Sequence, residues 1–375
     1  MAYTTVDDPL QYFNTVLYTG DIVDGDGTYH DQAITGMGFQ PDWLWHKGRS
    51  HARQHIWADS VRGTGGSPTQ MLGISSQDAN AETNINNNGW IKTLDSDGFT
   101  VTSGGDSSSR SNNAGASGNT YVAWGWKAGT TISSTSTSGS GTAKTYTGSV
   151  NTDAGFSIIR YVGNGTAGHT IPHHLGAKPH AILVKHLGDG QQWATQWAPL
   201  TATHVLRFAT ANAASDSNTR WNDTEPTTSV FTLGNEHEGN TNDGNHIAYC
   251  FTSIKGYSKI GSYTGNANGN GPFIFTGFKP AWIMIKNASA GSTDWMIYDN
   301  KRGGPAATVY GNNNKYFLKA NTGVAEANET FDMYSNGFKI RITNNFLNGS
   351  GNELIYMAFA ESPLVNSNGI PTTAR

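Results

Sequence analysis

The chain has 375 residues, enough for two or three domains, and carries 24 basic against 28 acidic side chains, a formal charge of −4. This weakly acidic balance excludes a large basic surface for nucleic acid or for an anionic membrane. Only 14% of the residues are charged while 46 are glycine, a composition that favours short strands and turns over long helices. The sequence therefore predicts an all-β protein.

The chain begins with a lead segment, residues 1–15, that has neither the basic region nor the apolar region of a secretory signal. No apolar run elsewhere approaches the roughly 18 residues of a membrane-spanning helix, so we expect no insertion into a membrane. The single cysteine, Cys250, lies in an alternating apolar stretch and is expected to be a small buried side chain. One cysteine excludes an intrachain disulfide.

Three stretches share one signature, in which a proline precedes a lysine by six residues and an apolar run fills the gap. They run from Pro41 to Lys47, from Pro179 to Lys185 and from Pro280 to Lys286. A short apolar run that is bounded by glycine and proline predicts a buried strand. A Tyr-x-Gly stretch precedes each signature and a tryptophan-containing stretch follows it. The repetition predicts three related units in tandem.

Each unit consists of short apolar runs separated by turn signals, the pattern of a β-sandwich or jelly roll of about 100 residues. We predict the units at residues 16–129, 153–256 and 257–363, followed by an extended C-terminal tail at 364–375. Residues 130–152 are rich in serine, threonine and glycine and predict a flexible linker. The second and third units follow each other directly, so we expect these two to form one rigid piece.

Two clusters of polar residues suggest metal sites, and neither has the spacing of a known ligand set. Asp24, Asp26 and Asp31 lie in a stretch without the glycine and glutamate of an EF-hand, which favours a hairpin turn over a loose Ca²⁺ site. His51 and His55 have i,i+4 spacing but lack the glutamate of a zinc-protease helix, and we interpret these two and nearby His46 as solvated loop histidines. We therefore predict no metal and no cofactor.

Catalytic patterns are equally scarce in the sequence. No pair of carboxylates repeats between the units, and neither a nucleophile elbow nor a phosphate-binding loop is present. We expect no catalytic residues and no enzyme activity. The remaining chemistry is aromatic, and most tryptophans are expected in the core. Four that lie beside polar stretches are our candidates for stacking on sugar rings: Trp90, Trp193, Trp197 and Trp221.

Nearly the whole chain resembles a family of virion structural proteins, the tail-fibre-like proteins of tailed phages that infect marine bacteria (cyanophages and pelagiphages). The similar stretches are residues 39–47, 121–129, 153–159, 256–265, 271–286, 298–302, 356–363 and 365–371. The resemblance implies a virion protein that is assembled in the cytoplasm of the bacterial host. It also implies other tail or capsid proteins as partners and favours a homotrimer, but it brings no catalytic or binding residues with it.

On this basis we expect a tail-fibre or receptor-binding subunit that contacts a host-surface polysaccharide without chemistry. Two alternatives stay open: a protein that decorates the capsid or the tail and has no receptor role, and a tailspike that degrades polysaccharide. A receptor-binding subunit should bind host cells by itself, whereas a decoration protein should cover a shell and ignore cells.

Overall fold

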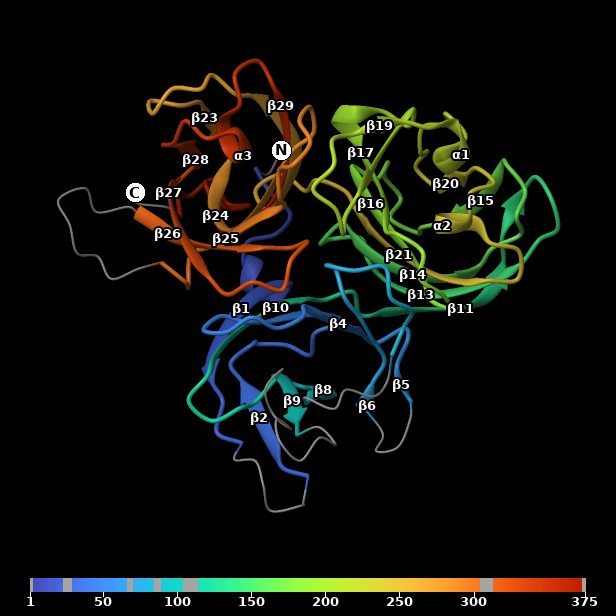
Figure 1. The fold of residues 1–375 in the computed structure, drawn as a ribbon, viewed down its shortest axis with the longest axis horizontal. Helices are drawn as coiled ribbons and strands as arrows, with labels where there is room; N and C mark the ends of the chain where they lie inside the picture. Colours follow the sequence, from blue (N-terminus) through green and yellow to red (C-terminus); the bar gives the residue numbers. More distant parts are fainter. Residues whose placement is uncertain are drawn as a thin grey trace.

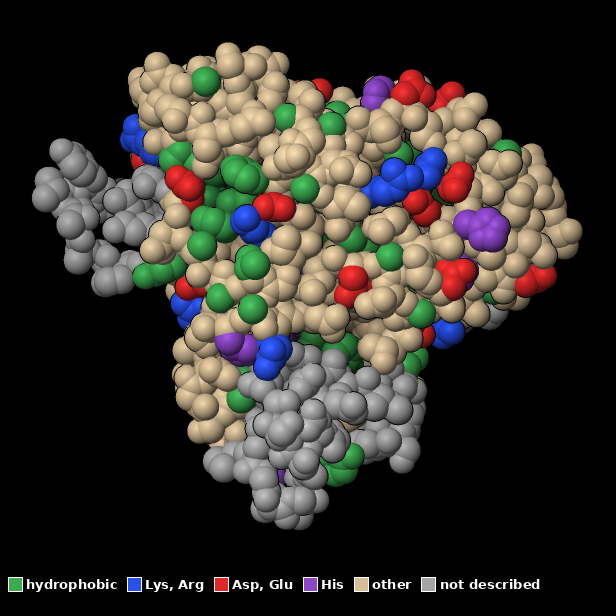
Figure 2. Space-filling model, viewed as in Figure 1, with side chains coloured by type: hydrophobic (Ala, Val, Ile, Leu, Met, Phe, Trp, Pro, Cys, Tyr) green, Lys and Arg blue, Asp and Glu red, His purple; other side chains and the backbone are tan. Residues whose placement is uncertain are grey.

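The computed structural model describes residues 3–22, 29–65, 70–83, 89–103, 114–303 and 313–372. These residues form 29 strands and only five short helices, so the protein is all-β, as predicted. The helices are η1 (Pro9–Gln11), η2 (Ala198–Leu200), α1 (Asn218–Trp221), α2 (His237–Asn240) and α3 (Asn345–Asn348). Three lobes surround a common centre (Figure 1) and pack against one another as one body (Figure 2).

The first lobe, blue to cyan in Figure 1, has a five-stranded antiparallel sheet of order β1-β10-β3-β4-β7. Its strands are β1 (Phe13–Thr19), β10 (Thr120–Trp126), β3 (Trp43–Gly48), β4 (Ile56–Asp59) and β7 (Gly73–Ile74). A second sheet, which packs on it through a shared apolar core, consists of β2 (Asp31–Thr35), β9 (Gly98–Thr102) and β8 (Trp90–Asp95). A short pair is formed by β5 (Thr64–Gly65) and β6 (Gln70–Met71).

The second lobe, green to yellow in Figure 1, has an eight-stranded sheet and a three-stranded sheet. In spatial order the large sheet contains β11 (Thr130–Ser136), β13 (Thr145–Asn151), β14 (Phe156–Val162), β21 (Asn245–Phe251), β16 (Ala181–His186), β17 (Ala194–Trp197), β18 (His204–Arg207) and β19 (Ser215–Asp216). The small sheet contains β12 (Ser138–Gly139), β15 (His169–Pro172) and β20 (Val230–Leu233).

The third lobe, orange to red in Figure 1, has one eight-stranded sheet. In spatial order its strands are β22 (Ser258–Thr264), β29 (Glu353–Pro363), β24 (Phe278–Asn287), β25 (Met296–Asp299), β26 (Asn313–Lys319), β27 (Ala327–Tyr334), β28 (Gly337–Ile340) and β23 (Phe273–Phe275). The sequence-based division into tandem sandwich units stays a prediction; below, the word lobe refers only to the sheets described here.

The three Pro–Lys signatures form β3, β16 and β24, and these strands have corresponding places in their sheets. Each is paired on one side with the last long strand of its lobe, β10, β21 or β29. On its other side it is paired with the tryptophan-containing stretch, which forms β4, β17 or β25. A strand that is paired on both edges and covered on both faces needs the nearly continuous apolar run that the signature supplies.

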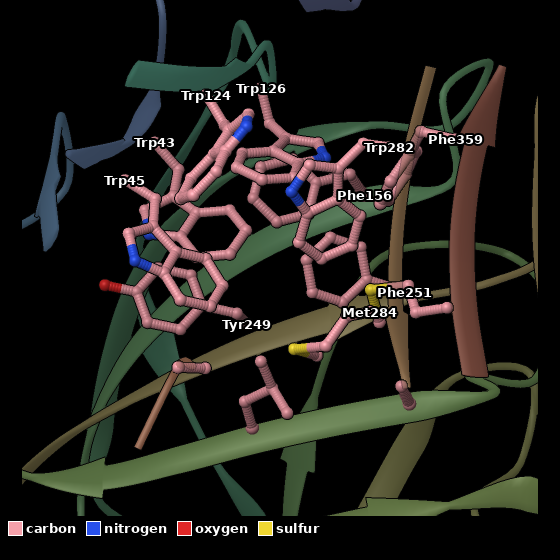
Figure 3. Close-up of a cluster of buried hydrophobic side chains, with 14 of the residues drawn as sticks. Trp43, Trp45, Trp124, Trp126, Phe156, Tyr249, Phe251, Trp282, Met284 and Phe359 are labelled. Atoms are coloured by element: carbon pink, nitrogen blue, oxygen red, sulfur yellow. The ribbon is translucent and has the colours of Figure 1, made fainter. Parts of the chain in front are cut away.

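One aromatic core lies where the lobes meet, and every lobe contributes to it (Figure 3). The ring centroids of Trp43 and Trp126 in the first lobe are 4.2 Å apart. Trp43 also lies 4.9 Å from Tyr249 of the second lobe, and Trp126 lies 5.6 Å from Phe359 of the third. Large aromatic side chains bury much apolar surface and so contribute strongly to the stability of a core. This shared cluster therefore holds the three lobes together.

Residues 130–152 are not a flexible linker, and that prediction was wrong. β11 and β13 pair with each other, and β13 pairs with β14 at the edge of the large sheet of the second lobe. Threonine is a good strand former, and an exposed edge strand tolerates small polar side chains. Composition alone therefore could not separate this edge strand from a coil.

The chain after β29 is likewise not an extended tail. Val365 and Pro371 form an isolated bridge, and the amide of Asn366 donates to the carbonyl of Ile370 at 2.9 Å. The amide of Ser367 donates to the carboxylate of Asp7 at 2.6 Å. The segment 364–372 thus turns back and lies against the beginning of the described chain.

Candidate functional site

The four tryptophans that we predicted to stack on sugars are all buried, so that prediction was wrong. The exposed fraction is 2% for Trp90, 0% for Trp193 and 1% for both Trp197 and Trp221. Trp193 and Trp197 belong to the central core, and the other two belong to the cores of the first and second lobes. A ring must expose a face to bind a saccharide, and none of these does.

Two of these buried indoles donate to backbone carbonyls that are distant from them in the sequence. The indole nitrogen of Trp193 donates to the carbonyl of Ser75 in the first lobe at 2.9 Å. That of Trp90 donates to the carbonyl of Met71 at 2.9 Å, and Gly73 makes room for its ring, since a Cβ there would lie 2.0 Å from it. Because a backbone carbonyl of any residue can accept this bond, polar residues beside a tryptophan in the sequence do not indicate that its ring is exposed.

Two of the three neighbouring histidines are also buried, which corrects their interpretation as solvated residues. His46 and His55 are both 0% exposed. The indole of Trp45 donates to Nδ1 of His55 at 2.7 Å, and Nε2 of His55 lies 3.0 Å from the carbonyl oxygen of Lys319 in the third lobe. Burial lowers the pKa of His46 to about 3 and that of His55 well below its ordinary value, so both are neutral.

No metal centre emerges from the described part of the chain. Residues 24–27 of the suggested calcium turn lie outside the described residues, and nearby Asp31 forms an ion pair with Lys92. Nowhere in the described ranges do three His, Cys, Asp or Glu side chains gather as metal ligands would. In the same ranges no helix has the length and apolar character needed to cross a membrane.

The lysine of each signature joins its own lobe to a neighbouring lobe. All three lysines are 0% exposed, and their Nζ atoms bond to backbone carbonyls across the lobe boundary. The pairs are Lys47 with Gly323 at 3.2 Å, Lys185 with Ala79 at 3.2 Å and Lys286 with Ala211 at 3.3 Å. The first lobe thus reaches the third, the second reaches the first and the third reaches the second, which closes a ring.

A backbone hydrogen bond repeats beside each lysine. The acceptor is the backbone carbonyl two residues after the lysine. The donor is a backbone amide of the neighbouring lobe, three residues after the residue whose carbonyl the lysine binds. The bonds are Glu326 to Arg49 at 2.9 Å, Glu82 to Leu187 at 2.9 Å and Ala214 to Ala288 at 2.8 Å. The same pair of contacts, which we call the lysine joint, is therefore built three times.

Two of the three joints also contain a buried carboxylate. The hydroxyl of Tyr249 donates to Asp59 at 2.7 Å, across the boundary between the second and first lobes. The indole of Trp124 donates to Asp299 at 2.9 Å, between the first and third lobes. Arg62 and Arg302 lie 2.5 Å from the same carboxylate oxygens and compensate their charge. Such compensation is necessary because an unpaired buried charge is strongly destabilising.

At the third joint the two equivalent positions are occupied by apolar residues. In strand register Met357 faces Met284 as Tyr249 faces Leu183, so Met357 stands at the donor position. Trp197 ends β17 at the place where Asp59 ends β4, so it stands at the acceptor position. Donor and acceptor are replaced together, and neither is left unpaired.

Burial makes the three lysines unusually weak bases. Burial, together with the nearby charges of Arg302 and Arg53, lowers the pKa of Lys47 to about 7. Burial lowers the pKa of Lys185 and of Lys286 to about 8. A lysine with such a pKa can be a nucleophile or a base. Here the geometry assigns a different task, because the ammonium groups are enclosed and bonded to carbonyls of two lobes.

The exposed aromatic residues escaped the sequence reasoning. In the described residues the exposed large apolar side chains are Leu10, Tyr29, Phe273, Phe275, Val324 and Ile370. Phe273 and Phe275 are two residues apart on β23, and side chains at this spacing point to the same face of a strand. The sequence does contain a signal, because Ile274 stands between two phenylalanines. Side chains alternate along a strand, so either the isoleucine or the two phenylalanines must face solvent.

Comparison with known proteins gives a family but no activity. Neither the curated proteins nor the solved structures contain a match to the chain. The model of one family, described as a domain of unknown function (DUF7483), matches residues 8–363 and so extends over all three lobes. The chain belongs to the DUF7483 family.

Proposed function

We propose that this protein is a structural component of a phage virion, a tail-fibre or receptor-binding subunit that contacts a host-surface polysaccharide without chemistry. The observation that carries the proposal is the lysine joint. The three buried lysines are each bonded to a backbone carbonyl of another lobe. They hold the lobes in fixed relative positions, and a protein that presents a binding surface to a host cell requires such rigidity.

The character of the surface agrees with this role. Figure 2 shows a face on which charged and hydrophobic side chains are scattered among uncharged polar side chains and backbone. A surface of this kind suits weak, hydrated contacts with hydroxyl-rich ligands, whose total strength grows when several copies act together. The resemblance of nearly the whole chain to tail-fibre-like proteins supports the virion part of the proposal, and a homotrimer remains the oligomer that we favour.

Cell binding tests the proposal directly. Purified, fluorescently labelled protein is incubated with host and with non-host bacteria, and the bound signal is measured after washing. We expect host-selective binding. Protein that is shown to be folded, that ignores cells and that covers the capsid or tail in labelled electron micrographs would establish the decoration role in its place. Release of reducing sugar ends from host polysaccharide would establish a tailspike enzyme.

A further inference from the structure

We propose that the outer face of β27, β28 and β23 in the third lobe is a binding site for an acidic saccharide. This inference rests on the proposed receptor role and gives that role a place on the protein.

The face is defined by the strand registers. Met333, Phe338 and Ile274 lie in neighbouring positions on the three strands and point into the core of the third lobe. Side chains alternate along a strand, so the residues on either side of these three point outward. The outward residues are Asp332 and Tyr334 on β27, Lys339 and Gly337 on β28, and Phe273 and Phe275 on β23.

The exposed rings of Phe273 and Phe275, with Tyr334 beside Phe273, form what we call the aromatic platform. Phe273 is 45% exposed and Phe275 is 50% exposed. The ring of Phe273 lies beside Tyr334, with 5.9 Å between centroids and 69° between planes. Its tip lies above Gly337, where a Cβ would be 2.9 Å from Cζ. Flat aromatic surface that is fixed before binding is what the apolar face of a pyranose ring can stack on at low entropic cost.

Basic side chains surround the platform and favour a ligand that carries negative charge. Arg341 lies 2.5 Å from the carboxylate of Asp332 and 2.9 Å from the hydroxyl of Tyr334. Lys259 lies 5.7 Å from the ring centroid of Phe275, and Lys339 stands opposite Phe273. Three cations thus accompany one carboxylate that is only 6% exposed, although the whole chain has a charge of −4. This local excess complements a saccharide with carboxylate groups.

The other two lobes provide an internal comparison. The Ile274–Phe338 pair of the third lobe recurs as Ile34–Phe99 in the first and Ile171–Phe231 in the second. The outward residues that flank the isoleucine are alanine and threonine in the first lobe and threonine and proline in the second, at positions 33, 35, 170 and 172. The same strand pairing therefore forms without phenylalanine. Exposed aromatic residues that the fold does not need mark a binding surface.

The test exchanges the platform for the residues of the first lobe, in the double variant Phe273→Ala, Phe275→Thr. Wild type and variant are titrated against immobilised alginate and polygalacturonate, which carry carboxylates, and against neutral dextran. We expect the wild type to bind an acidic polymer and the variant to bind it about tenfold or more weakly, since two stacked rings are lost. Tyr29→Ala, which removes an exposed aromatic of the first lobe, is the matched control and should bind like the wild type.

Each result has a definite meaning, provided that thermal unfolding shows an intact fold. Equal binding by wild type and variant would place the saccharide elsewhere and overturn the site while the receptor role stands. Equal binding of dextran and the acidic polymers would overturn the acidic specificity. Selective binding to host cells without binding to either acidic polymer would also overturn it. If the wild type bound neither polymers nor cells, the site and the receptor role would fall together. If the variant changed only the oligomeric state, the face would be a protein contact.

Discussion

The ammonium nitrogen of Lys185 lies 3.2 Å from the carbonyl oxygen of Ala79, 106 residues away in the chain and in a different lobe. Corresponding bonds start from Lys47 and Lys286. A lysine near the end of a strand is solvated in most proteins. Here it is buried and holds two neighbouring lobes together.

Replacing Lys286 by methionine should lower the free energy of unfolding by about 1–3 kcal/mol, because buried carbonyls of Ala211 and Thr293 lose their donor. The loss should be larger at pH 9 than at pH 7. The pKa of Lys286 is about 8 in the folded protein and 10.5 in a free lysine, so the unfolded chain binds more protons in this window and the wild type gains stability as pH rises. The methionine variant lacks this gain.

Urea unfolding at both pH values measures these differences. Lys178→Met, which removes a partly exposed ion pair with Glu225, is the control and should change stability by less than about 1 kcal/mol. A Lys286→Met variant that resembles this control would mean that the lysine joint does not stabilise the contact between lobes.

Replacing Tyr249 by phenylalanine should destabilise the protein by about 1.5–3 kcal/mol, the usual range for a hydrogen bond to a charged group. The variant loses only the hydroxyl that donates to Asp59. In an Asp59→Asn background the same change should have a smaller effect, because the charged acceptor is already gone. The coupling energy from this double-mutant cycle, measured by denaturant unfolding, is the readout; a value near zero would contradict the assigned contact.

Stability should fall as the pH drops below 6.5, and His46 should account for part of the fall. Its pKa is about 3 in the folded protein against 6.5 in a free histidine, so between these values only the unfolded chain takes up the proton. This costs up to about 1.4 kcal/mol of stability per pH unit. His46→Gln, which keeps a polar partner for the hydroxyl of Tyr18, should reduce the slope. An unchanged slope in the His46→Gln variant would contradict this assignment.

Native tryptophan fluorescence should be blue-shifted and should resist quenching by iodide, because all 11 tryptophans are buried. Unfolding in guanidinium should restore quenching and serves as the internal control. Saccharides should bind without changing this emission, since the proposed platform consists of phenylalanine and tyrosine. Strong iodide quenching of the folded protein would show that some indoles are accessible after all.

The sequence predicted local structure well because local structure depends on neighbouring residues. The apolar runs between Pro41 and Lys47 and between Pro280 and Lys286 are central strands, as their patterns indicate. The all-β class follows from the same signals together with the many glycines and the scarcity of helical periodicity.

Contacts between lobes could not be predicted in this way. Gln191 and Gln192 suggested that Trp193 lies in a surface loop, but its indole crosses into the first lobe and is buried there. Likewise, no spacing rule relates Lys47 to Gly323, since the two are 276 residues apart. The sequence suggested a rigid contact between the second and third units but gave no sign that the first lobe is fixed to both of them by the same kind of joint.

The joints run head to tail around the ring, each lobe donating to one neighbour and accepting from the other. A contact of this kind can equally be made with the matching lobe of a second molecule. Conditions that loosen one joint without unfolding the lobes should therefore favour domain-swapped oligomers. In such an oligomer an opened ring exchanges a lobe with its neighbour, and every lysine regains a carbonyl partner from another chain.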